Sequence, residues 1–139
     1  METSVELSAR AQQYYILCRR WESDLEFFKI ETAFLHRLLD DYFVRLLAPA
    51  YFEDLKHTSA KLFELEKNES ALRKQLSVHL KQLELVAENV IPEDIENLAD
   101  AQVEIESLVS KLDNEYREVK KELFALVEKA MNEKKLIVG

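Results

Sequence analysis

Two pairs of histidine and aspartate are the residues of this chain whose types and spacing best suit metal binding. His36 and Asp40 are four residues apart, and Asp54 and His57 are three apart, so each pair shares one face of a helix. If the chain reverses near Pro49, the two pairs come within one or two helical turns of each other. Helical bundles hold metals between helices with histidine and carboxylate ligands at such spacings. A metal-binding bundle is therefore one hypothesis, the alternative to the function given below.

Two observations favour an ordinary surface role for the same four residues. The Glu-x-x-His repeat of ferritin-like metal sites does not occur in the sequence. The neighbouring residues Leu35, Leu39 and Leu55 occupy apolar core positions, so the histidines and aspartates are expected to point outward. Solvent-exposed ion pairs on the helix surface are therefore the competing interpretation.

The sequence lacks the common motifs for other kinds of chemistry. It has no glycine-rich phosphate loop, no Cys-x-x-Cys and no His-Glu-x-x-His. Its one cysteine, Cys18, lies on an apolar stripe, about 27 Å by helical rise from His36. His79 and Glu69 fall on another apolar seam, where we expect hydrogen-bonded core residues, with a small-molecule pocket as a further alternative. We therefore predict no enzymatic activity and no cofactor.

The composition favours an all-helical protein. Glycine occurs once and proline twice, too few for the turns of a hairpin-rich or α/β fold. The net charge is −8, from 19 basic and 27 acidic residues, which disfavours binding to nucleic acid or to anionic membranes. No uncharged apolar segment approaches the roughly 18 residues of a membrane span, and no secretory signal is recognisable. A lone cysteine agrees with a reducing compartment, and we predict a cytoplasmic location.

Apolar residues recur at alternating steps of four and three along three segments, as on the packed face of a long helix. The segments cover about residues 4–47, 51–90 and 93–135, and they are separated at Pro49 and Pro92. Because the connections are short, neighbouring helices are expected to be antiparallel. We therefore predict an all-α fold, an up-down-up antiparallel bundle of three long helices that resembles a coiled-coil rod. We expect a single domain over residues 1–135, completed by oligomerisation, and a frayed C-terminal tail at residues 136–139.

The first segment carries a second, smaller apolar stripe. Phe27, Ile30 and Phe34 follow i, i+3, i+7 spacing and face away from the packed stripe, to which Trp21 and Tyr42 belong. Exposed contiguous apolar surface usually marks an interface. The sequence therefore predicts a non-enzymatic protein–protein interaction or scaffolding module, most simply a homodimer, whose outer stripe binds a partner helix with support from Trp21 and Tyr42. In the competing interpretation the first helix is central and its neighbours cover the stripe.

Overall fold

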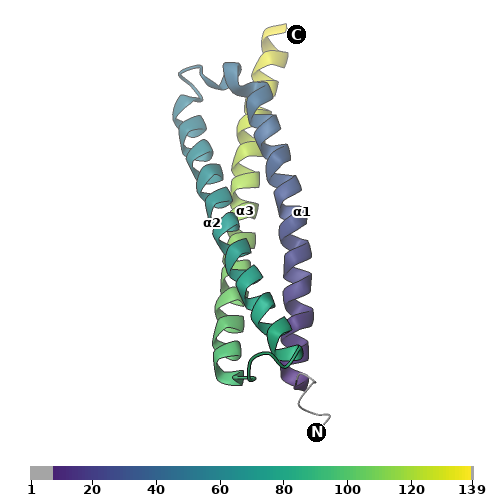
Figure 1. Ribbon diagram of the computed structural model, residues 1–139. Helices are drawn as coiled ribbons and strands as arrows, with labels where there is room; N and C mark the ends of the chain where they lie inside the picture. Colours follow the sequence, from purple (N-terminus) through teal and green to yellow (C-terminus); the bar gives the residue numbers. More distant parts are fainter. Residues whose placement is uncertain (1–7, 139) are drawn as a thin grey trace. The chain divides into compact units, whose positions relative to one another are not determined.

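The computed structural model describes the backbone of residues 8–138 and the side chains of residues 8–132. Most of the chain forms three α-helices: α1, Ala9–Leu46; α2, Phe52–Ala87; and α3, Ile95–Val138 (Figure 1). The described part of the chain contains no β-strand. The prediction of an all-α bundle of three long helices is confirmed. The coiled-coil rod, its completion by oligomerisation and the single domain over residues 1–135 stay predictions.

The two outer ends of the helical region lie near the limits of the described residues. Residues 4–7 of the predicted first helix lie outside them. Ser8 precedes α1, and its hydroxyl oxygen accepts a hydrogen bond from the backbone N–H of Ala11 at 3.1 Å, which is N-cap geometry. The backbone of α3 continues to Val138, through most of the predicted tail at residues 136–139. Gly139 is not among the described residues.

The end of α2 uses asparagine where many helices use glycine. Asn89 has a φ of 61°, in the left-handed region that asparagine tolerates better than most residues. The N–H of Val90 donates to the carbonyl of Leu85 at 2.9 Å, and the N–H of Asn89 donates to that of Val86 at 3.0 Å. These two bonds form a Schellman motif, which ends α2 three residues before the predicted limit at residue 90.

The start of α3 is set by an aspartate instead of by Pro92. One carboxylate oxygen of Asp94 accepts a hydrogen bond from the backbone N–H of Asn97 at 3.3 Å, and the other accepts one from the Asn97 side chain at 2.9 Å. Asp94 is therefore the N-cap, and the helix begins at Ile95. Pro92 lies in the connection and not in the first turn of the helix.

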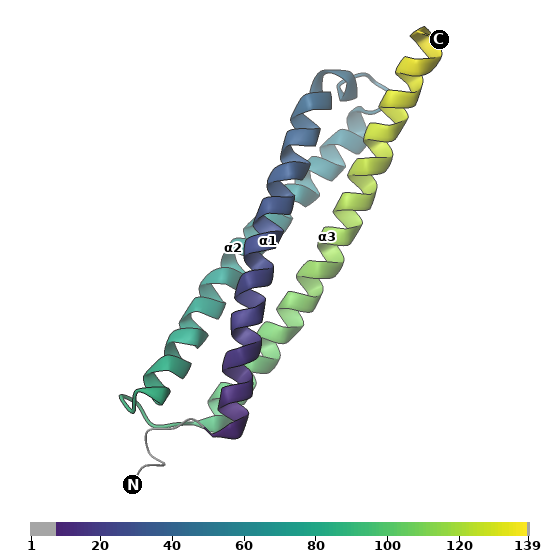
Figure 2. The same cartoon turned by 90° about the vertical axis from the view of Figure 1, so that its right-hand side faces the viewer.

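The chain divides into two compact units, each built from sections of all three helices (Figures 1 and 2). Unit 1 comprises Met1–Phe27 and Glu69–Lys111, and unit 2 comprises Phe28–Asn68 and Leu112–Gly139. Within the described residues, none of the helices has a segment that is both long enough and apolar enough to cross a membrane.

In unit 1, α1 and α3 run in the same direction. The backbone N–H of Ser8 donates to the carboxylate of Glu93 at 3.0 Å, and further along both helices the thiol of Cys18 donates to the amide oxygen of Gln102 at 3.3 Å. The core of this unit is mainly aliphatic, with a few polar residues. Its buried apolar residues are Ala11, Cys18, Trp21, Leu25, Leu72, Leu76, Leu80, Leu83, Val86, Leu98 and Ile105.

In unit 2, α2 and α3 run in opposite directions. Lys61 of α2 donates to Glu122 of α3 at 2.9 Å, whereas the later Asn68 reaches the earlier Glu115 at 3.4 Å. Leucine dominates the core, as the steps of four and three predict. Its buried apolar residues are Leu35, Leu39, Leu46, Leu55, Leu62, Leu65, Leu112, Tyr116, Val119, Leu123, Leu126, Val127 and Ala130.

Candidate interaction surface

The outer face of α1 carries three large apolar side chains in contact with solvent. Phe27, Ile30 and Phe34 are 62%, 66% and 53% exposed. Because the side chains lie three and four residues apart on one continuous helix, they share a face. The other helices do not cover them, as the competing interpretation of a central first helix would require. We call Phe27, Ile30 and Phe34 the outer stripe.

The two residues predicted to support the stripe differ in their surroundings. Trp21 is buried in the core of unit 1, so its indole is not available to a partner. Tyr42 is half-buried, and the guanidinium of Arg45 lies 5.2 Å from the centre of its ring. Trp21 can support an interface only by fixing the position of α1, whereas Tyr42 retains some exposed surface.

Further residues extend the outer stripe toward both ends of α1. Ile16 and Val44 are exposed and lie fourteen residues before and after Ile30, which keeps them on nearly the same face. Arg20 and Asp41 are also exposed and lie seven residues outside Phe27 and Phe34. Sequence reasoning missed this pair, although the seven-residue spacing was the signal that could have found it.

Exposed apolar residues on the other helices have different surroundings. Phe63 of α2 and Val103 of α3 are 68% and 67% exposed. On α2, the outer line near Phe63 consists of Ala60 and three lysines. The lysines are Lys67, Lys74 and Lys81, and all four residues are exposed. Scattered surface residues of this kind are normal in soluble proteins. Phe124 and Met131 of α3 are also exposed and lie seven residues apart, but among the described residues α1 carries the longest series of exposed aromatic and branched side chains on one face.

The structure does not bring the four proposed metal ligands together. His36 contacts the carboxylate of Glu66 on α2 and not that of Asp40, its expected partner. Asp40, Asp54 and His57 are exposed. Among the described residues, no three histidine, cysteine, aspartate or glutamate side chains are placed to hold a metal ion. The surface interpretation therefore fits His36, whose side chain is half-exposed and whose ring nitrogen Nε2 contacts Glu66 of a neighbouring helix.

A polar cluster joins all three helices in the core of unit 1. The side chain of Gln102 on α3 lies between Cys18 of α1 and His79 of α2. Its amide oxygen accepts from the Cys18 thiol at 3.3 Å and from Nε2 of His79 at 2.9 Å, and its amide nitrogen donates to the carbonyl of Tyr14 at 3.5 Å. The prediction that His79 is a hydrogen-bonded core residue is confirmed.

The buried surroundings of the cluster affect two of its atoms, the sulfur of Cys18 and Nδ1 of His79. Burial raises the pKa of the Cys18 thiol from 9.0 to about 11, and the hydrogen bond to Gln102 offsets only part of this effect. Cys18 is therefore a protonated, unreactive thiol at neutral pH. Nδ1 of His79 is buried, and no described protein atom hydrogen-bonds to it. The cluster holds the helices in register but lacks the low-pKa nucleophile that thiol catalysis needs.

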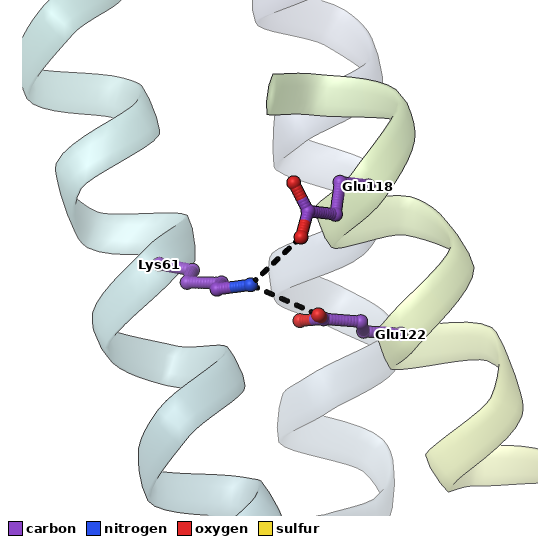
Figure 3. A network of polar contacts seen from close by, with 3 residues as sticks. All are labelled: Lys61, Glu118 and Glu122. Atoms are coloured by element: carbon purple, nitrogen blue, oxygen red, sulfur yellow. Dashed lines mark hydrogen bonds and ion pairs between the residues drawn. The ribbon is translucent and has the colours of Figure 1, made fainter. Parts of the chain in front are cut away.

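A network of charges links α2 and α3 in unit 2. The ammonium group of Lys61 donates to Glu122 at 2.9 Å and to Glu118 at 3.1 Å (Figure 3). These bonds raise the pKa of Lys61, with Glu122 as the larger influence. Glu122 and Glu118 lie four residues apart on one helix, so a single lysine can contact both. This arrangement serves helix pairing.

A second polar contact in unit 2 links α1 and α3. The hydroxyl of Tyr116 donates to the carboxylate of Glu31, and the ammonium group of Lys120 lies 3.7 Å from the same carboxylate. Burial and the Glu31 carboxylate together raise the pKa of Tyr116, so the phenol stays protonated. The ring of Phe28 packs edge-on against the ring of Tyr116, and the two ring centres are 5.1 Å apart.

An open cavity of about 450 Å³ lies between α1 and α2 in unit 1. Its two arginines are held in ion pairs, Arg19 with Glu22 at 2.9 Å and Arg73 with the carboxylate of Glu69. His79 and Glu69, around which a ligand pocket was one alternative, do not line it. The lining residues are Arg19, Glu22, Ser23, Leu25, Glu26, Arg73, Leu76 and Ser77.

Comparison with protein-family models, with curated proteins and with solved structures finds no match for this chain. The surface and the core described above are therefore the basis for inferring function.

Proposed function

We propose that this chain is a non-enzymatic interaction or scaffolding module, which binds a partner helix or another copy of itself through the outer stripe. The exposure of Phe27, Ile30 and Phe34 on one helical face carries the proposal. Large aromatic side chains are costly to leave in water and dominate the energetics of interfaces when they are buried. Helices commonly bind other helices through such i, i+3, i+7 anchors.

Three features of the chain support a binding role over catalysis. The buried thiol of Cys18 has a raised pKa, and the His36 ring is engaged by Glu66. Both arginines that line the cavity of unit 1 are held in ion pairs, Arg19 with Glu22 and Arg73 with Glu69. We also propose a coiled-coil-like mode of helix packing and a cytoplasmic location, the latter supported by a single cysteine that is buried and unpaired.

The test replaces the two aromatic anchors by aspartate, as Phe27→Asp with Phe34→Asp. Each anchor contributes about 2 kcal/mol when buried at an interface, so the double variant weakens binding to a separate partner helix by about 1000-fold in Kd, and self-association, in which both chains carry the changes, by more. The purified chains are compared by light scattering over a dilution series. Tagged chains capture partners, and the binding of each identified partner is measured again with purified protein.

A matched control keeps the added charge but changes other faces. Phe63→Asp with Val103→Asp alters two residues of similar exposure on α2 and α3. The proposal requires that this control binds like the wild type and that all variants keep the same helical content by circular dichroism. Unchanged association in Phe27→Asp with Phe34→Asp, or equal losses in both double variants, would overturn it.

A further inference from the structure

The outer face of α1 carries a line of four residues with a regular spacing of seven. The line is Arg20, Phe27, Phe34 and Asp41, a cation, two aromatic rings and an anion. α1 is one helix from Ala9 to Leu46, so residues seven apart lie two turns apart and drift only by about 20° around the axis. All four side chains are exposed. When this line is placed antiparallel to a second copy of itself, the cation of each copy faces the anion of the other.

The charges at the two ends of the line are not used within the chain. Among the described residues, Arg20 and Asp41 form no ion pair and no side-chain hydrogen bond, whereas the nearby Arg19 is held by Glu22 at 2.9 Å. The two free charges lie symmetrically about the midpoint between Phe27 and Phe34, which falls between residues 30 and 31. Their placement therefore matches an interface with a two-fold axis at that point.

We propose that the occupant of the outer stripe is a second copy of this chain, with its α1 antiparallel; this rests on the proposed function and names its partner. A two-fold axis near Ile30 places Phe27 opposite the partner's Phe34 and Arg20 opposite the partner's Asp41, each contact occurring twice. Ile30 lies beside the partner's Ile30. The apolar rings form the centre of the interface and the ion pairs form its rim.

A neighbouring line on the same face fits the antiparallel arrangement as well. Ile16 and Val44 are exposed and lie at equal distances from Ile30. The two-fold axis therefore brings Ile16 against the partner's Val44, which extends the apolar contact in both directions. A parallel dimer instead places Arg20 against the partner's Arg20 and Asp41 against the partner's Asp41, and like charges at such positions disfavour association.

Among the described residues, the corresponding outer lines of the other two helices carry mainly polar side chains. The outer line of α2 after Ala60 consists of Lys67, Lys74 and Lys81, all exposed, which repel the same line of a second copy. The outer line of α3 is polar throughout, from Asp100 through Ser107 to Asn114. α1 is therefore the helix through which two copies associate.

Charge reversal at the rim tests both the partner and its direction. We expect Arg20→Asp and Asp41→Arg each to weaken the dimer by about tenfold or more, because two attractive pairs become two repulsive ones. The double variant, with both reversals in one chain, restores the pairs with exchanged signs and associates like the wild type. Kd is measured by sedimentation or light scattering between about 1 μM and 1 mM, the range in which such dimers dissociate.

The controls separate specific pairing from net charge. Lys74→Asp and Asp100→Arg make the same charge changes at exposed positions on α2 and α3 and should leave Kd unchanged. In a parallel dimer, Arg20→Asp merely replaces two facing cations by two facing anions. An unchanged Kd for Arg20→Asp, or failure of the double variant to recover, would therefore overturn the antiparallel arrangement.

The outcomes for the two proposals are distinguishable. A wild-type chain that stays monomeric up to about 1 mM overturns self-association. If Phe27→Asp with Phe34→Asp then abolishes binding of an identified helical partner, the proposed function stands while the second copy is excluded as the occupant. If that double variant changes neither mass nor partner binding, both proposals fail.

Discussion

Replacing Gln102 by leucine tests how much the polar cluster in unit 1 stabilises the bundle. Gln102 is almost fully buried, and its amide oxygen accepts the hydrogen bonds of Cys18 and His79. Leucine has a similar volume, so the change removes the amide without opening a large cavity. His79 keeps its position, but Nε2 loses its bond while Nδ1 already has no protein partner.

The expected cost follows from the polar groups left without partners. A buried donor that loses its acceptor costs about 1–3 kcal/mol, and the weak thiol bond adds little, so we expect Gln102→Leu to lower the free energy of unfolding by about 2 kcal/mol. His79→Leu removes an imidazole that is only half satisfied and should cost about 1 kcal/mol or less. When both residues are changed, the imidazole is absent, so no Nε2–H is left without an acceptor. The free energy of unfolding of the double variant should therefore be close to that of His79→Leu alone.

The assay is urea unfolding monitored by far-ultraviolet circular dichroism. The dependence of the free energy of unfolding on urea concentration, the m value, must be the same for all variants. The two single changes and the double change form a cycle whose coupling free energy should be at least about 1 kcal/mol. As a control, Leu35→Ala in unit 2 costs about 2–5 kcal/mol but shares no partner with His79, so the two changes should add. Additive effects of Gln102→Leu and His79→Leu would refute the proposed cluster energetics.

The remaining predictions concern two titratable groups. Because folding raises the pKa of the Cys18 thiol from 9.0 to about 11, its stabilising contribution is intact below pH 9 and is lost as the pH rises to 11. Relative to Cys18→Ala, the wild type should lose on the order of 2 kcal/mol over this range in urea titrations, and its thiol should react slowly with disulfide reagents at pH 8. An equally pH-dependent Cys18→Ala would contradict this. Lys61→Gln should lower the thermal midpoint at low salt, because Glu118 and Glu122 lose their shared cation. The difference should shrink in about 1 M salt, and a salt-independent difference would count against the charge network.

The core could be predicted from the sequence because burial follows helical periodicity. Leu35 and Leu39 were placed on the packed stripe by steps of four and three, and both are buried. The end of α2 was less predictable, since the left-handed residue is Asn89 and not the glycine that usually marks such a turn. The capping role of Asp94 was hidden for a similar reason, because Pro92 is itself a good residue for a first helical turn.

The partners of surface residues could not be predicted in the same way. Spacing along one helix pairs His36 with Asp40, but the structure pairs it with Glu66 of a neighbouring helix. Such contacts depend on the register between helices. An apolar seam with many equivalent leucines specifies that register only weakly. Exposure of the outer stripe was predictable for Phe27, because its angle on α1 lies away from the seam.

The burial of the hydrophobic core within one chain determines what association between two chains can add to its stability. Completion of the bundle by oligomerisation stays a prediction, and both units already bury most of their leucine residues within the chain. The proposed dimer through α1 would add an interface to cores that each chain already buries. Dissociation should then leave each chain folded, which is why aspartates at Phe27 and Phe34 are expected to change mass and not helicity. If those variants unfolded instead, the outer stripe would belong to the core of an obligate assembly.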